Sequence, residues 1–182
     1  MERTERLETP SHARACATRP SFRRVALRGA ARGAGAGVVA TVAMSVVMLG
    51  AQKAGLLGKL PPKKITEGLL GVIGIRQKTP ERAKNVLATL NHFAFGGACG
   101  ALFGLGHEIW RTRPRGAASA RDRRAPIAAG LVFGSAVWAV SYAGWVPALG
   151  IMPTPPNDRP GRPTSMVIAH WVFGAALAKM VA

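Results

Sequence analysis

Two histidines lie inside apolar stretches and are the residues of this sequence best suited to chemistry. His92 opens the phrase HFAFG at residues 92–96, and His170 opens the related phrase HWVFG at residues 170–174. Such imidazoles can ligate a haem or a metal ion, or relay protons, because histidine titrates near neutral pH. The alternative, which we favour, is that each donates a hydrogen bond and steadies the fold. His92 and His170 are therefore a candidate ligand-binding or proton-handling pair.

Other signs of an enzyme are missing from these stretches. Asp and Glu are almost absent from them, so no carboxylate pair is available for acid–base catalysis. Glu67 and Asp158 lie between the apolar stretches, where we expect them to be solvated. Cys16 and Cys99 show no metal-site spacing, and no glycine loop has the context that cradles phosphates. We expect a protein that is not an enzyme and has neither a cofactor nor a metal.

The placement of charge indicates how the histidines are positioned. The 182 residues suffice for one domain and include 25 Lys and Arg against 8 Asp and Glu, for a net charge of +17. Such a charge is typical of nucleic-acid binders and of membrane proteins with basic flanks. Here the charges lie almost wholly between four uncharged stretches, residues 33–52, 85–106, 125–157 and 163–178. A soluble bundle would show charged helix faces, so the pattern favours a membrane protein.

Each uncharged stretch is about as long as a membrane span. A hydrocarbon core about 30 Å thick needs roughly 20 apolar residues in a helix. The last stretch reaches that length if Lys179 extends its ammonium toward the headgroups. We predict an all-α integral membrane four-helix bundle over residues 33–182, with spans at about 34–52, 84–106, 126–147 and 163–181.

The flanking charges predict the orientation. Residues 1–32 are Arg-rich and lack a sustained apolar pattern, so we expect a disordered cytoplasmic tail, with a cleaved signal peptide as the alternative. The tail, the loop at 111–124 and the C-terminus carry 15 Lys and Arg, against 10 in the other two loops. The positive-inside rule then places both termini in the cytoplasm.

The related phrases also predict an internal repeat. LGKLPP at residues 57–62 precedes HFAFG, and LGIMPTPP at residues 149–156 precedes HWVFG. Both halves leave the cytoplasmic side and return to it, so they are predicted to be parallel helical-hairpin repeats about an axis along the membrane normal. Chance similarity between helices rich in Gly and Ala is the alternative.

Two further patterns concern packing. Gly96, Gly100 and Gly104 recur every four residues, as do Gly130 and Gly134, and such faces let membrane helices approach closely. The contacts could lie within the chain or between subunits, which leaves a homo-oligomer open. In the first loop, Ile65, Leu69, Val72 and Ile73 recur at helical spacing, which predicts an amphipathic helix at the membrane interface.

The first apolar stretch, the LGxxP segments, PPKKIT and the H-x-x-F-G starts resemble a group of small bacterial four-helix membrane proteins of unknown function. The second half is also distantly similar to the YagU-like inner-membrane family. The resemblance covers about residues 33–182. It implies a location in the bacterial cytoplasmic (inner) membrane and supplies no catalytic residues.

We therefore expect a non-enzymatic membrane protein with a structural, envelope-stress or small-solute role. The alternative is a haem- or metal-binding redox protein that uses His92 and His170. The expected partners are the lipid bilayer and anionic lipid headgroups at the basic tail and loops. Nucleic acid is disfavoured, because the basic residues lack the interleaved aromatic residues on which bases stack.

Overall fold

The computed structural model describes residues 22–111 and 125–182, and this part of the chain is helical without strands. Its elements are α1 (Phe22–Lys53), α2 (Pro61–Val72), α3 (Glu81–Arg111), α4 (Ala125–Val140), a π-helical turn (Ser141–Trp145), α5 (Val146–Ala148), a short 3-10 turn (Pro155–Asn157) and α6 (Arg162–Val181).

Four helices are long and apolar enough to cross a membrane, as a multi-pass membrane protein requires. They are Phe22–Lys53, Glu81–Arg111, Pro126–Ala148 and Arg162–Val181. Large apolar side chains such as Val39, Leu102 and Val132 point outward from them. An apolar outer surface suits helices surrounded by lipid. The prediction of an all-α fold with four helices of spanning length is confirmed.

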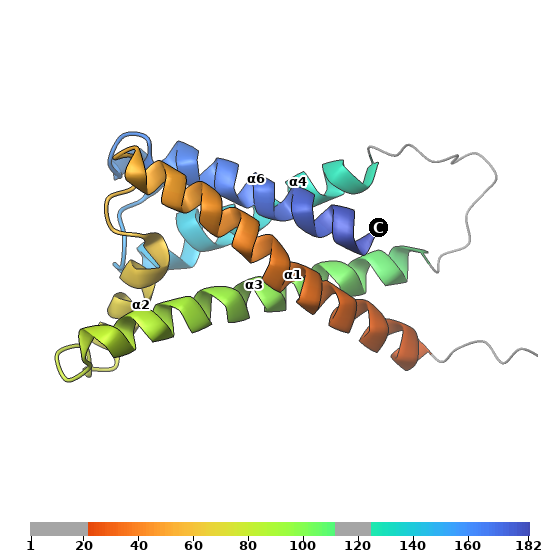
Figure 1. The fold of residues 1–182 in the computed structure, drawn as a ribbon, viewed down its shortest axis with the longest axis horizontal. Helices are drawn as coiled ribbons and strands as arrows, with labels where there is room; N and C mark the ends of the chain where they lie inside the picture. The colour runs from red at the N-terminus through yellow and green to blue at the C-terminus, as the bar shows by residue number, and fades with distance from the viewer. Residues whose placement is uncertain (1–21, 112–124) are drawn as a thin grey trace, which may run out of the picture.

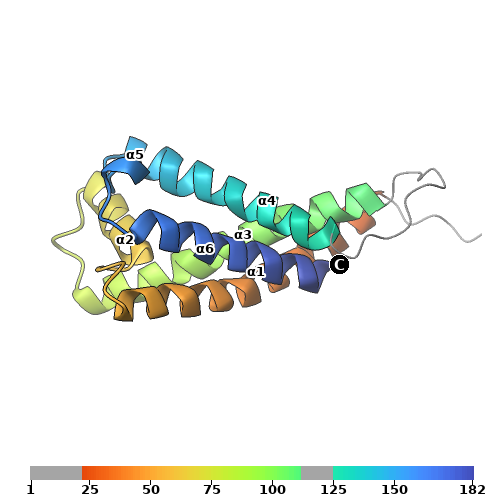
Figure 2. The same cartoon turned by 90° about the horizontal axis from the view of Figure 1, so that it is seen from above.

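The helices form a bundle in which α1 is central. α1 packs against both α3 and α6, and α4 packs along α6. Figures 1 and 2 show the start of α1 and the end of α6 at one end of the bundle. The opposite end carries α2 and the segments that lead into α3 and α6, and we call it the α2 end.

Close backbone approach at glycine holds the helix pairs together. A Cβ atom added at most of the glycines paired below would collide with the backbone of the facing helix, and at Gly96 it would collide with the side chain of Thr41 on α1. The pairs are Gly29–Gly104, Gly33–Gly100 and Gly37–Gly96 between α1 and α3, and Gly130–Gly174 between α4 and α6. Gly134 meets the carbonyl of His170 in the same way. The structure therefore places the predicted glycine faces in contacts within the chain.

Two helices end in the same way at the α2 end. Gly55 after α1 and Gly150 after α5 have φ angles of +78° and +67°. Each is followed by a residue whose N–H bonds back five positions, Leu56 to Ala51 O at 2.9 Å and Ile151 to Val146 O at 3.2 Å. This is the Schellman arrangement, which favours glycine at the left-handed position. Gly55 and Gly150 therefore occupy the same position in two copies of one helix-ending motif.

The predicted tail needs correction over residues 22–32, which belong to α1. Alanine, leucine and arginine in this segment are good helix formers, so the helix continues ahead of the apolar span. Gly29 also packs on Gly104, and Arg32 Nη1 lies 3.8 Å from Glu108 Oε1 on α3. Residues 1–21 and 112–124 lie outside the described residues, so the expectations for the rest of the tail and for the second loop stay predictions.

The helix predicted in the first loop is confirmed as α2, which faces inward more than expected, and its place at a membrane interface stays a prediction. Ile65 and Leu69 turn toward the bundle and line a cavity there. Val72 and Ile73, at the far end of the helix, are exposed. α2 therefore covers the end of the bundle with part of its apolar face.

Candidate functional site

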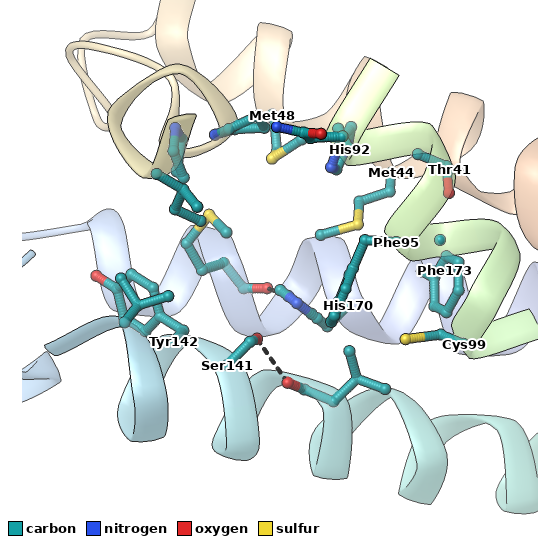
Figure 3. Close-up of a pocket in the computed structure, with 18 of the residues that line it drawn as sticks. Thr41, Met44, Met48, His92, Phe95, Cys99, Ser141, Tyr142, His170 and Phe173 are labelled. Atoms are coloured by element: carbon teal, nitrogen blue, oxygen red, sulfur yellow. Dashed lines mark hydrogen bonds between the residues drawn. The ribbon is translucent and has the colours of Figure 1, made fainter. Parts of the chain in front are cut away.

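A cavity of about 200 Å³ lies in the half of the bundle nearest α2. Its walls come from α1, α2, α3, α6 and the region of the π-helical turn (Figure 3). Most of the lining is apolar, with Met44, Met48 and Phe173 among the side chains. Beyond the cavity, Phe103 on α3 and Phe133 on α4 meet with ring centroids 5.2 Å apart.

The structure brings the two histidines singled out by the sequence to this one cavity. Figure 3 shows His92 on α3 and His170 on α6, each on a wall of the cavity. His170 Nδ1 lies 2.7 Å from the carbonyl oxygen of Met166. Because a carbonyl only accepts, Nδ1 carries the proton and donates it, and Nε2 of the neutral ring is an acceptor.

The hydrogen bonding of the His92 ring differs from that of His170. Its Nε2 atom is buried and has no hydrogen-bond partner among the residues that the structure describes. His170 fills the structural role that we had favoured, through its bond to its own helix. An unpaired polar atom in an apolar wall is destabilising, so His92 is the better candidate for contact with a ligand.

Three hydroxyl groups on the cavity wall donate their hydrogens within the chain, whereas a fourth, that of Thr66, accepts from Asn91 Nδ2 at 3.5 Å. Thr41 donates to Gly37 O at 2.7 Å, and Ser141 donates to Val137 O at 2.6 Å, both within their own helices. Tyr142 donates to the Asp158 carboxylate. Their hydrogens are therefore in use, and the oxygens keep lone pairs. The polar part of the wall is suited to a ligand that donates hydrogen bonds.

The cavity reaches the outer apolar surface of the bundle beside α3. Phe95 and Leu69 both line it, and they are also 45% and 37% exposed. In the described part of the chain, α3 and α4 do not pack along each other, unlike α1 with α3 or α4 with α6. A small apolar molecule could therefore enter sideways, between α3 and the region of the π-helical turn.

Comparisons with known proteins do not place the chain in a family. No protein-family model, curated protein or solved structure matches it. The resemblance to YagU-like membrane proteins therefore stays a prediction that rests on short motifs.

A metal centre is poorly supported by the ligands available. Cys99 lines the cavity together with His92 and His170. Across residues 22–111 and 125–182, however, no group of three or more His, Cys, Asp or Glu could hold a metal ion. Structural and catalytic metal sites generally take three or four protein ligands.

A buried ionic network closes the α2 end beside the cavity. Arg162 donates from Nε and Nη2 to the carbonyl oxygen of Leu57, at 3.1 and 2.8 Å. Its Nη1 lies 2.5 Å from Asp158 Oδ1, and Tyr142 donates to Asp158 Oδ2. The side chains of Arg162 and Asp158 are only 5% and 2% exposed. The network joins the start of α6 to the end of α1 and to the π-helical turn.

The prediction that Asp158 is solvated was therefore wrong. Arg162, Tyr142 and Leu57 together supply the partners that a buried carboxylate and guanidinium need. The sequence held one usable signal, because an acid four residues before an arginine matches the spacing of a helical ion pair. The contact with Leu57, 105 residues away, had no such signal.

The same prediction was wrong for Glu67. Its side chain is 8% exposed, with Lys59 Nζ at 2.6 Å and Arg76 Nη2 at 3.6 Å from its carboxylate oxygens. α2 lies across the end of the bundle, and Glu67 on this helix lies between the two cations and residues 149–151. The cations come from the segments on either side of α2, which periodicity within the helix does not reveal.

Proposed function

We propose that this chain is a multi-pass protein of the bacterial cytoplasmic membrane that binds a small, largely apolar molecule with a hydrogen-bond donor. The observation that carries the proposal is the convergence of His92 and His170 on one apolar cavity that reaches the outer surface of the bundle. The role is binding rather than catalysis. Among the roles expected from the sequence, this proposal corresponds to the small-solute role.

The acceptors on the wall support the choice of ligand. His170 Nε2 and the oxygens of Thr41 and Ser141 can each accept a hydrogen bond, and so can His92 Nε2 in the tautomer that carries its proton on Nδ1. A buried polar atom left without a partner costs about 1–3 kcal/mol. A hydroxyl or amine on the ligand would supply the missing partner, while its apolar part would contact Met44, Phe173 and their neighbours.

The size of the cavity separates this proposal from the redox alternative. Cavities for drug-sized ligands usually measure about 300–1,000 Å³, and this one is about 200 Å³. A porphyrin is too large for such a space unless the helices separate. The side chains on the cavity wall that could ligate a metal are the two histidines, Cys99, Tyr142 and the thioethers of three methionines. A small organic molecule fits both the volume and the chemistry.

We also propose that the bundle is two parallel hairpin repeats with both termini in the cytoplasm. The matching helix ends at Gly55 and Gly150 support this. So do the glycines four residues after each histidine, since Gly96 packs on α1 and Gly174 packs on α4. In this arrangement His92 and His170 occupy corresponding positions, and the cavity lies between the two repeats.

Phenol and toluene test the proposed ligand class, because they are nearly isosteric and only phenol donates a hydrogen bond. With purified protein in mild detergent, we expect phenol to bind about fivefold more tightly than toluene. Replacing His92 with leucine should abolish that preference and leave toluene binding nearly unchanged. Ligand-observed NMR titration measures both affinities.

The control is His107→Leu, which replaces a histidine on the same helix that does not line the cavity. It should keep the preference for phenol. Equal binding of the two probes by the unaltered protein would contradict the proposal. A visible spectrum and a metal analysis of the same sample test the alternative. Stoichiometric haem or metal that is lost in the His92→Leu/His170→Leu variant would support the redox function instead.

A further inference from the structure

A second pocket, of about 360 Å³, lies at the α2 end on the other face of α2. Ile65, Thr66 and Leu69 face the apolar cavity, whereas Lys64, Glu67 and Gly68 face this second pocket. Residues 149–151 form its opposite wall. We call it the basic pocket, because Lys59, Lys64 and Arg76 line it with Glu67 as the single acid.

The charges in the basic pocket are not balanced. Three cations and one carboxylate leave a net charge of +2 on its lining. The carboxylate of Glu67 is already held by Lys59 and Arg76. Asp158, another acid whose charge acts on Lys64, is paired with Arg162. Positive charge therefore remains in the pocket without a partner from the described residues.

Lys64 is the cation of the basic pocket whose side chain is left without a partner. Its side chain has no hydrogen bond or ion pair among the described residues. Burial lowers the pKa of its ammonium, and the nearby cations Arg162, Lys59 and Arg159 lower it further, against an opposing effect of Asp158. An anion placed beside Lys64 would relieve both the repulsion and the loss of hydration.

We propose that the basic pocket binds a phosphate group, with Lys64 as the central contact and Lys59 and Arg76 at its sides. An ammonium offers three donors, and an arginine can present two parallel N–H groups to phosphate oxygens. The pocket lies beyond the ends of the apolar spans, which is where lipid phosphates would lie if these helices cross a bilayer. A phospholipid headgroup or free phosphate would supply the same chemistry. The proposal is independent of the ligand in the apolar cavity.

Two probes distinguish the sources of phosphate. The full-length protein in an uncharged detergent is titrated with inorganic phosphate and, separately, with short-chain phosphatidylglycerol, by calorimetry at low salt. We expect at least one probe to bind, with affinity falling as salt rises. Binding of the lipid alone identifies a headgroup site, and binding of free phosphate identifies a site for a soluble anion.

The decisive variant is Lys64→Gln, with Lys63→Gln as its matched control. Lys63 is the adjacent residue on α2, but it pairs with Glu81 and does not line the basic pocket. We expect about a tenfold weaker affinity for Lys64→Gln and an unchanged affinity for Lys63→Gln. An equal loss in both variants, or no binding of either probe, would overturn the proposal. Phenol binding by Lys64→Gln should match that of the unaltered protein, which keeps this test separate from that of the cavity.

Discussion

Replacing Gly33 with isoleucine is expected to lower the free energy of unfolding by about 3 kcal/mol, because the side chain would be driven into the facing helix. A Cβ atom at Gly33 already collides with the carbonyl of Gly100 and crowds the Cα of Gly104. These are backbone atoms of α3, so no side chain can rotate away. α1 and α3 would have to separate, and dispersion contacts along their interface would be lost.

Gly35→Ile is the matched control for this experiment. Gly35 lies two residues further along α1, and a Cβ atom there meets nothing within 4 Å. Both variants change the helix propensity of α1 equally, so their difference isolates the contact with α3. Thermal or denaturant unfolding in mild detergent, followed by circular dichroism, measures the effect. Equal stabilities for the two variants would refute the role assigned to the glycine contact.

Replacing Arg162 with methionine is expected to cost about 3–5 kcal/mol, the usual effect of removing one partner from a buried ion pair. Asp158 would keep its charge at a nearly inaccessible position, with the Tyr142 hydroxyl and the Arg159 N–H as remaining donors. The carbonyl of Leu57 would lose both of its guanidinium bonds. The start of α6 should then loosen from the end of α1.

Two further variants sharpen this experiment. Arg159→Met removes a neighbouring guanidinium whose hydrogen bond, to Gly55 O at 3.1 Å, is solvent-exposed, and it keeps the backbone N–H that bonds Asp158, so it should cost less than about 1 kcal/mol. Arg162→Met/Asp158→Asn removes the stranded charge as well, so it should be more stable than Arg162→Met alone. Stabilities that simply add in the double-mutant cycle would show that the two side chains do not act as a pair.

The positions of the spans could be predicted because a bilayer imposes a requirement on composition alone. A helix in hydrocarbon must be apolar over about 20 consecutive residues, and four uncharged stretches reveal this directly. The sequence placed the start of the first helix too far along the chain, because the first residues of α1 are basic and not apolar. This part of the helix is supported by the contact of Gly29 with α3. That contact leaves no trace in local composition.

Part of the candidate site could also be predicted. A histidine in an apolar span is unusual, so His92 and His170 could be singled out one by one, and the glycine spacing identified one face of α3 and one of α4. The sequence did not indicate that both imidazoles border one cavity, or that only His170 has its Nδ1 proton engaged. Those properties depend on how each helix is rotated about its axis and on how the helices cross. A single residue inserted at a feature such as the π-helical turn changes which side chains face the cavity.

By itself, then, the sequence determined which segments are helical and apolar, where the charge lies and which residue types are out of place. Only the tertiary structure decided the surroundings of Asp158 and Glu67, the partners of the glycines and the two faces of α2. The physical reason is that desolvation depends on groups that meet in space. Arg162 and Leu57 are 105 residues apart in the chain, yet their contact helps to bury the ion pair at the α2 end.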